Sequence, residues 1–408
     1  MFFLQAAYCR AFQAAFRAAL PILPYREPEI VPTLAELDRV FIKEKIKKVL
    51  IVADQGVRNA GLLVPVEEAA AKSGVACVVY DKTRPNPTVD NVEEALNVYR
   101  QNDCDALIAV GGGSPIDCAK TVGARVAYPK KSVGKLKGLL RVWRALPPLI
   151  AVPTTAGTGS ETTVAAVIVD AEKQHKYALL SFPLTPTYAV LDPTLTFSLP
   201  PSLTATTGLD ALVHAVEAYV GRSTTKETRR LALDATKLIF ANLETACVDG
   251  RNREARANML RAAHMAGLAF SKSYVGYIHA VAHALGGRYG TPHGLANAVL
   301  TPCVLDAYGK SVWRKLRDLA VAAGVASSQD SASEAAEKFV AAVRRLNAKL
   351  GIPERLPEIR REDVPTMARL AAKEANPLYP VPKLLTAKEL ERFYYEIAER
   401  GEEGSETR

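Results

Sequence analysis

Three of the chain's six histidines fall within one short stretch near residue 280. His279 and His283 are four residues apart, so in a helix both rings lie on one face, one turn apart. The glycines at 286–287 predict the end of that helix. Thr291 and Pro292 predict the cap and first position of the next helix, which places His293 at a helix start.

A second segment repeats the four-residue spacing, with Asp210 followed by His214. A single histidine on an apolar helix face is usually structural, but three in one stretch together with an Asp-x3-His pattern favour a metal site. The two segments offer up to five nitrogen or oxygen ligands. That set is enough to bind one borderline divalent metal and to leave one side chain for catalysis.

Two small-residue loops predict a phosphate-binding edge. Residues 111–117 read GGGSPID after an apolar strand, with Ser114 suited to a helix N-cap, and residues 153–161 read PTTAGTGSE after another strand. Neither loop is a GxGxxG fingerprint, but two together favour a dinucleotide site. Asp54, at the end of an early strand, would bind a ribose and repel the extra phosphate of NADP. This favours NAD, although an ordinary surface carboxylate is the alternative.

The elements that must position these residues differ between the two halves of the chain. Apolar runs at 47–54, 75–81, 106–110 and 149–152 alternate with helical patterns at 65–73 and 92–102, which predicts a parallel α/β sheet covered on both faces. Beyond about residue 200 the pattern is helical, as at 228–245 and 333–350. We therefore expect an amphipathic helix at 1–24, an α/β dinucleotide-binding domain at 25–198 and an all-helical metal-binding domain at 199–408.

Composition bounds the function classes. The chain has 408 residues, 49% hydrophobic and 23% charged, which is typical of a globular protein in a two-domain size range. A net charge of +9 and sparse aromatic residues do not indicate nucleic-acid binding. Six scattered cysteines without a CxxC pair indicate a reducing, cytoplasmic location.

The N-terminal segment 1–24 is apolar but contains Arg10 and Arg17, so it is too interrupted to span a bilayer or to be a signal peptide. We expect it to form a helix that ends at Pro21 and packs on the body or on a second subunit. Contact with a membrane surface is the alternative. A basic stretch at 130–144 is read as a solvated face, with an acidic partner or a membrane left open.

Five motifs in order carry a family resemblance: GGGSPIDCAK at 111–120, PTTAGTGSE at 153–161, LDPTLT at 191–196, GLDALVHAVEAY at 208–219 and HAVAHALGGRYGTPHG at 279–294. They resemble the iron-containing, group III alcohol dehydrogenases over roughly residues 45–395. The resemblance implies a Rossmann-like α/β N-terminal domain and an all-α C-terminal domain, the dehydroquinate synthase-like architecture, with a metal in the cleft between them. The chain departs from the family in its N-terminal extension and at residues 30–34.

The resemblance also implies residue roles. The implied metal ligands are Asp210, His214, His279 and His293, while His283 would lie near the nicotinamide and the substrate and act in catalysis. The implied cofactor positions are Asp54, Asn86, Gly112, Gly113, Ser114, Thr154, Thr155, Thr158, Lys176 and Thr196. Independently of the resemblance, Ala165 with its small neighbours Thr163 and Ala166, together with Phe270, are candidates for an apolar substrate pocket.

These observations predict an NAD(H)-linked, metal-dependent dehydrogenase that interconverts a primary alcohol and its aldehyde. The metal would bind the substrate oxygen and lower its pKa, and His283 is hypothesised to relay the proton to solvent, with a structural role as the alternative. The ligand set does not fix the metal, since Zn can compete with Fe(II), and it is the resemblance that favours Fe(II). We also expect a homodimer. The alternatives are a dehydroquinate synthase-like or polyol or hydroxy-acid-phosphate enzyme, and a non-catalytic assembly protein.

Overall fold

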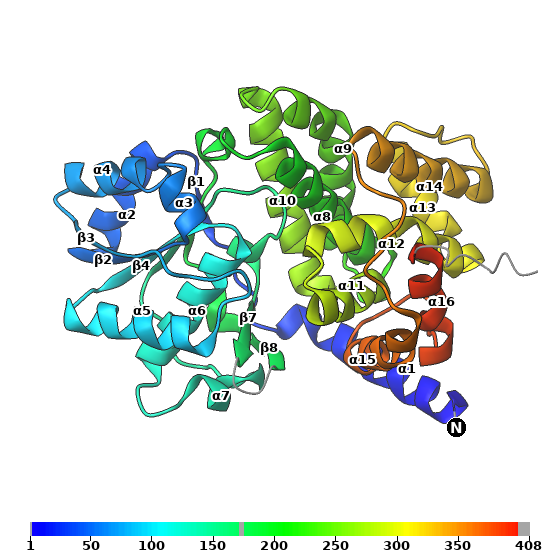
Figure 1. Ribbon diagram of the computed structural model, residues 1–408, viewed down its shortest axis with the longest axis horizontal. Coiled ribbons are helices and arrows are strands. Elements are labelled where there is room, and N and C mark those ends of the chain that lie inside the picture. Colours follow the sequence, from blue (N-terminus) through cyan, green and yellow to red (C-terminus); the bar gives the residue numbers. More distant parts are fainter. Residues whose placement is uncertain (1, 171–174, 399–408) are drawn as a thin grey trace, which may run out of the picture.

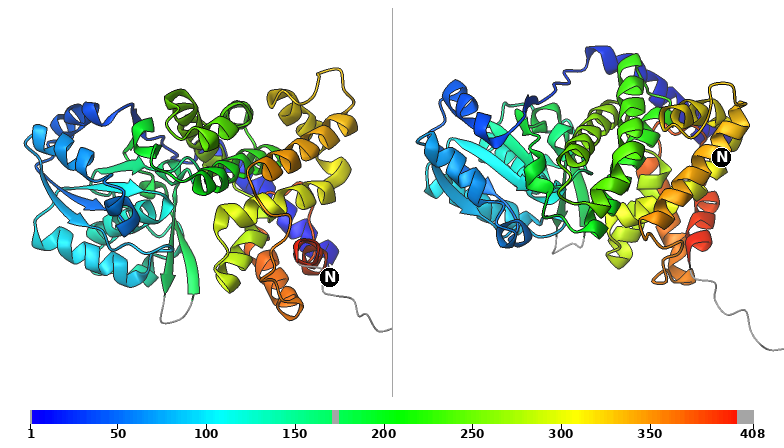
Figure 2. Two further views of the ribbon diagram at one scale, coloured as in Figure 1. Left: turned by 45° about the horizontal axis from the view of Figure 1, so that its top comes forward. Right: turned by 90° about the horizontal axis from the view of Figure 1, so that it is seen from above.

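The computed structural model describes residues 2–170 and 175–398, and the side chains of residues 4–170 and 177–398. The described chain forms two halves side by side, an α/β half drawn from blue to green and a helical half drawn from green to red, on which the blue helix at the N-terminus also lies (Figures 1 and 2). Among these residues no helix is both long and apolar enough to cross a bilayer. The predicted change from α/β to helical texture near residue 200 matches the start of α8 at Pro201.

The α/β half is built on a six-stranded sheet in which every pairing is parallel, in the order β1-β9-β6-β4-β2-β3. Its strands are β1 (Glu29–Val31), β2 (Lys48–Val52), β3 (Ala76–Tyr80), β4 (Ala106–Gly111), β6 (Leu149–Pro153) and β9 (Tyr188–Val190). A smaller sheet contains β5 (Gly138–Leu139), β8 (His175–Leu180) and β7 (Ala165–Asp170). The four predicted strands are β2, β3, β4 and β6.

Helices cover both faces of the large sheet because both faces of its central strands are apolar. Leu50 and Val52 point into the cluster that α5 and α6 complete, whereas Val49 and Ile51 point into the opposite cluster with α2 and α4. The helices of this half are α2 (Leu37–Glu44), α3 (Gln55–Asn59), α4 (Val64–Lys72), α5 (Val89–Gln101), α6 (Gly113–Ala127) and α7 (Val133–Leu136). This burial explains the near-continuous apolar runs in the sequence.

β3 and β4 flank β2 on opposite sides, so the direction of winding reverses at β2. In an open parallel sheet such a reversal leaves a crevice outside the carboxyl ends of the strands, where ligands bind. The carboxyl ends of β2, β4 and β6 lead directly into Asp54, Gly111 and the loop at 153–161. The topology therefore gathers at one edge the segments that the sequence marked for dinucleotide binding.

The helical half has one continuous core, with small and apolar residues packed between its helices. Its helices are α8 (Pro201–Val220), α9 (Lys226–Val248), α10 (Arg253–Ser273), α11 (Tyr277–Tyr289), α12 (His293–Tyr308), α13 (Trp313–Ala322), α14 (Ala332–Lys349), α15 (Val364–Ala375) and α16 (Ala387–Ile397). α11 does not end at the predicted glycines at 286–287. It continues to Tyr289, and Gly290 caps it with a left-handed φ of 70°.

The N-terminal helix α1 (Phe2–Ala19) lies on the helical half, beside α15 and α16, and the chain then crosses to β1 in the other half (Figures 1 and 2). A short 3-10 turn at Leu20–Ile22 follows, close to the predicted end at Pro21. Cys9 and Gln13 are buried in this contact, at 3% and 4% exposure. The expectation that this segment packs on the body of the protein agrees with that placement.

Candidate metal and dinucleotide site

The sheet edge presents backbone N–H groups where a phosphate would bind. Gly111 has a φ of 146°, a conformation that side chains rarely adopt, and it turns the chain from β4 into α6. Gly112 is the N-cap of α6, not Ser114 as the sequence predicted, because the helix begins one residue after it at Gly113. The first N–H groups of α6 consequently lie immediately after the turn, in an arrangement that favours an anion.

The second loop lies against the first. Thr154 N donates to Gly111 O at 3.0 Å. A Cβ added at Gly112 would lie 3.4 Å from Thr155 Oγ1, and one added at Gly113 would lie 3.3 Å from Thr158 Cγ2. The predicted cofactor residues of both loops therefore lie together at one edge.

The remaining predicted cofactor positions have mixed surroundings. Asp54 caps α3, with Oδ1 accepting from Val57 N at 2.8 Å, and Asn86 N lies 3.3 Å from Ser114 Oγ. Thr196 is buried at 1% exposure and donates to Pro193 O. Lys176 lies in β8, and its side chain is outside the described residues. Asp54 and Asn86 thus border the crevice, while Thr196 and Lys176 stay predictions.

A buried lysine holds the segment that follows the second loop. Lys120 Nζ in α6 donates to Thr163 Oγ1 at 2.9 Å, to Thr163 O at 3.0 Å and to Ala165 O at 2.7 Å. Burial lowers the pKa of Lys120 to about 8. The carbonyl of Ala165 therefore has a structural partner, and the place of Ala165 in a substrate pocket stays a prediction.

Two glycines of the second loop dock it onto the helical half. A Cβ at Gly157 would lie 2.9 Å from Thr207 Cα of α8, and a Cβ at Gly159 would lie 2.7 Å from Gly267 Cα of α10. Real Cβ atoms do not approach so closely, so any larger residue would push the halves apart. The loop therefore brings the dinucleotide edge next to the helix that carries Asp210 and His214.

Three of the predicted metal ligands converge. Ligand atoms of Asp210 in α8, His279 in α11 and His293 at the start of α12 all lie within 4.8 Å of one another. Asp210 Oδ1 is 3.8 Å from His279 Nε2 and 3.4 Å from His293 Nε2. The predicted cap at Thr291 is wrong, since Pro292 precedes the helix and Thr291 donates to Glu358. His293 is nevertheless the first residue of α12, as expected.

His214 lies beside this group without being one of its three members. Its ring stacks on His279 with centroids 4.6 Å apart, and Phe270 stacks on its other side at 4.1 Å. His214 is buried, at 5% exposure. Phe270, expected in the substrate pocket, thus packs against a predicted ligand.

Glu217 orients His279. Its Oε2 lies 2.6 Å from His279 Nδ1, and its carboxylate also accepts from Gly276 N at 2.7 Å and from Ile278 N at 2.8 Å. Burial raises the pKa of Glu217 to about 8, although the backbone N–H groups that it accepts from act in the opposite direction. A Cβ at Gly276 would lie 2.7 Å from Glu217 Oε1, so a larger residue there would displace the carboxylate. In its ionised form Glu217 can only accept hydrogen bonds, and its contact with His279 then puts the proton of His279 on Nδ1.

The lone pair of His279 Nε2 then faces a carboxylate. His279 is 2% exposed, its Nε2 has no hydrogen-bond partner among the described residues, and Asp210 Oδ1 is 3.8 Å away. Burial and the neighbouring imidazoles hold the pKa of His279 well below its usual range, so the ring stays neutral. Two acceptors that face each other in a buried site are unfavourable without a cation between them. The donor set of neutral imidazoles and one carboxylate therefore fits a divalent metal such as Fe(II) or Zn(II).

His283 lies one turn from His279 at the more open side of the cluster. Its ring stacks on His293 with centroids 5.1 Å apart, and its side chain is 33% exposed. His283 Nδ1 lies 2.6 Å from Glu374 Oε1 of α15. The ring is thus close to the converging ligands, and it has a carboxylate partner of its own.

Sequence reasoning missed three polar residues of this site. Glu217 follows Asp210 and His214 at helical spacing on α8, so the i, i+4, i+7 pattern could have revealed it. Asn297, four residues after His293, donates to Asp210 Oδ1 at 2.7 Å and could have been found in the same way. Glu374 is far from His283 in the sequence, and no local signal points to it.

Comparison with known proteins gives the same family over both halves. Residues 31–193 match the family model of iron-containing alcohol dehydrogenase, and residues 204–397 match that of the C-terminal region of the Fe-containing alcohol dehydrogenase family. Residues 1–30, which include α1, lie outside the matched ranges.

Individual relatives and a solved structure point to the same family. The chain is 39% identical over 334 residues to a 1,3-propanediol dehydrogenase of Klebsiella pneumoniae, covering 81% of this chain and 86% of that protein. It is 37% identical over 332 residues to an NAD-dependent methanol dehydrogenase of Bacillus methanolicus, covering 80% and 86%. A solved structure of a 1,3-propanediol oxidoreductase superposes with a TM-score of 0.88 at 35% identity, covering 91% of this chain and 99% of that one.

Proposed function

Because the chain belongs to the iron-containing alcohol dehydrogenase family, we propose that it interconverts a primary alcohol and its aldehyde by exchange of a hydride with NAD. The observation that carries the proposal is the convergence of Asp210, His279 and His293 beside the loop that docks the dinucleotide edge. The dehydroquinate synthase-type, sugar-phosphate and non-catalytic alternatives are not favoured, since the relatives over both halves are alcohol dehydrogenases.

We assign the metal to Asp210, His214, His279 and His293, with Fe(II) as the resident ion and Zn(II) as a competitor. Support for His214 comes from its burial, at 5% exposure, and its stacking on His279. A divalent metal bound there supplies Lewis-acid polarisation of the substrate oxygen. The chain's own contribution is to orient the ligand atoms toward the metal position. Glu217 orients the ring of His279, and Asn297 orients the carboxylate of Asp210.

The cofactor is assigned to the crevice outside β2 and β4. The N–H groups at the start of α6 would hold the pyrophosphate, and the hydroxyls of Thr154, Thr155 and Thr158 border the same edge. Asp54 would accept a hydrogen bond from the adenosine ribose and repel a 2′-phosphate, which favours NAD over NADP. The methanol dehydrogenase relative is named as NAD-dependent, which agrees with that choice.

His283 is assigned the proton relay. It lies against His293, and a third of its side chain is open to solvent, so it can exchange protons with water. Phe270 and Ala165 remain our candidates for an apolar pocket that takes a short or medium primary alcohol.

We further propose a cytoplasmic homodimer. The six cysteines are all unpaired, as expected for a reducing compartment. β1 lies at one edge of the large sheet, and an edge strand can pair with the same strand of a second copy. Light scattering of the purified protein tests the dimer directly.

The function is tested on protein purified without chelators, with metal content measured by elemental analysis. NADH formation at 340 nm is followed with a series of primary alcohols, and NADH oxidation is followed with the matching aldehydes. We expect turnover with several short alcohols and a lower kcat/KM with NADP than with NAD. In the variant Asp54→Ala the preference for NAD should decrease. A metal-loaded protein that turns over no alcohol and no aldehyde would rule the proposal out.

A further inference from the structure

Glu374, at the end of α15, faces the active-site histidine from a helix that the family motifs do not include. Its Oε1 lies 2.6 Å from His283 Nδ1. We propose that Glu374 is a positioning residue that fixes the ring of His283, an inference that rests on the function proposed above. A glutamate carboxylate accepts hydrogen bonds and does not donate them. The contact therefore puts the proton of His283 on Nδ1 and leaves its lone pair on Nε2, which can accept a proton during turnover.

Tyr379 fixes the glutamate in turn. Its hydroxyl donates to Glu374 Oε1 at 2.8 Å, so one carboxylate oxygen accepts from Tyr379 and is paired with His283. Tyr379 is 9% exposed, and Tyr274 lies next to its ring. A partly exposed carboxylate with one fixed, buried donor loses much of its rotational freedom, and this makes it suitable for orienting a second group.

The loop that carries Tyr379 is held by the N-terminal helix. Gln13 Nε2 donates to Tyr379 O at 2.8 Å, and Arg10 donates to Val381 O at 2.7 Å and to Pro382 O at 3.1 Å. These carbonyls lie in an irregular segment, where side-chain donors replace the missing helix or sheet bonds.

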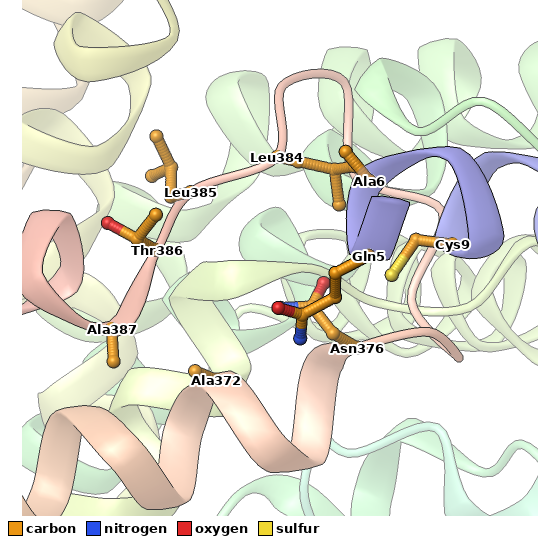
Figure 3. A pocket seen from close by; sticks show the side chains of 9 residues that line it. All are labelled: Gln5, Ala6, Cys9, Ala372, Asn376, Leu384, Leu385, Thr386 and Ala387. Carbon is orange, nitrogen blue, oxygen red and sulfur yellow. The ribbon is translucent and has the colours of Figure 1, made fainter. Parts of the chain in front are cut away.

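Further toward the N-terminus, α1 lies less tightly on the loop. A cavity of about 170 Å³ lies between α1 and the segment from Asn376 to Ala387, and Figure 3 shows Gln5 and Cys9 of α1 facing Asn376 and Leu384 across it. The polar contacts of Arg10 and Gln13 therefore hold the loop next to this cavity.

A second constraint acts on the plane of the His283 ring. His283 stacks on His293 at an interplanar angle of 19°, while Glu374 contacts the ring through its Nδ1 edge. Stacking fixes the tilt of the ring and the hydrogen bond fixes its rotation. Removing Glu374 leaves the ring contacts with His293 and His279 but takes away the hydrogen bond at Nδ1, so the ring can turn about χ2 and present the wrong nitrogen.

The test is a double-mutant cycle on the metal-loaded enzyme, with variants Glu374→Gln, His283→Ala and both together. If Glu374 acts through His283, E374Q lowers kcat about tenfold or more in the wild-type background. In the H283A background the same change alters kcat less than about twofold, because no ring is left to position. KM for NAD and the metal content should stay near wild type.

Two further variants complete the test. Glu374→Asp, which keeps the carboxylate, should recover part of the lost kcat, whereas E374Q should not. Lys373→Gln, an exposed neighbour on α15, is the matched control and should leave kcat unchanged. An equal loss from E374Q in both backgrounds, or a wild-type kcat in E374Q, would overturn the positioning role. A wild-type enzyme inactive with every alcohol and aldehyde would instead overturn the proposed function itself.

Discussion

His279 and His283 occupy successive turns of α11, and each places Nδ1 2.6 Å from a glutamate oxygen. The surroundings of the two pairs differ. The side chains of His279 and Glu217 are 2% and 1% exposed, whereas those of His283 and Glu374 are 33% and 36% exposed. A buried pair cannot exchange protons with water, so it suits a fixed ligand. A half-open pair can do so, and it suits proton transfer.

The groups that donate hydrogen bonds to the two glutamates also differ in rigidity. Backbone N–H groups of Gly276 and Ile278 hold Glu217, so its position is set by the start of α11 itself. A side-chain hydroxyl of an irregular loop holds Glu374, and that loop depends on α1. The comparison indicates that the same histidine–glutamate arrangement suits metal binding when it is buried and rigidly supported, and suits proton transfer when it is half-open.

The strongest test of this comparison removes each histidine in turn. His279→Ala should lose most of the bound metal, and turnover should fall roughly 10³-fold, because the Lewis acid is worth several kcal/mol. His283→Ala should keep the metal and lose about 10²-fold in turnover. Elemental analysis and kcat on the same preparations give the result. Full metal content in H279A, or metal loss in H283A, would show that the two roles are reversed or shared.

The glutamates should separate in the same way with a smaller effect. Glu217→Gln is expected to weaken metal affinity about 10–100-fold, since the partner that fixes the tautomer of His279 is altered. Glu374→Gln is the matched control, because it changes the same chemical group on the partner of His283. Competition with a fluorescent chelator measures both affinities. Equal affinities in E217Q and wild type would mean that the burial of His279 alone fixes its ring.

Metal removal provides a stability test that does not depend on activity. At a free metal concentration 100 times Kd, binding stabilises the folded state by about 2.7 kcal/mol. Stripping the metal with a chelator should lower the Tm of wild type and H283A by the same few degrees. H279A should show little change on chelation. A chelator-induced shift in H279A as large as that of wild type would place the stabilising metal elsewhere in the protein.

How much of this the sequence predicts depends on the range of each contact. His279, His283 and the pair Asp210 and His214 follow from helical spacing, and the parallel sheet follows from apolar runs that are buried on both faces. Their convergence does not follow from spacing, because it needs α8, α11 and α12 to meet. The family resemblance supplied that expectation.

The predictions that were wrong and the residue that was missed each have a specific structural cause. Residues 286–287 stay helical because glycine is tolerated inside a helix, and the left-handed cap falls at Gly290 instead. The N-cap of α6 moves to Gly112 because the turn at Gly111 ends two residues earlier than the Ser114 pattern suggests. Glu374 was missed because a contact between α11 and α15 leaves no periodic trace in the sequence.

The smallest expected effect on turnover comes from weakening the contact of α1 with the loop that supports the outer pair, His283 and Glu374. The double variant Arg10→Ala and Gln13→Ala removes the side-chain donors to Tyr379 O, Val381 O and Pro382 O while leaving His283 and Glu374 intact. Tyr379 O keeps its bond from Val381 N, but Val381 O and Pro382 O lose the Arg10 donor, which should cost about 1–2 kcal/mol in the free energy of unfolding. Denaturant unfolding measures that loss.

The same double variant should also lower kcat, by roughly two- to threefold, because Tyr379 then holds Glu374 less firmly while its hydroxyl remains present. Arg17→Ala is the matched control, since Arg17 lies on the exposed side of α1 and its removal should change stability by less than about 0.5 kcal/mol. Metal affinity should be unchanged in both variants, because Glu217 and His279 take their support from α8 and α11. A loss of metal affinity on removal of Arg10 and Gln13 would mean that the two pairs share one support, and the division between a rigid inner pair and a braced outer pair would not hold.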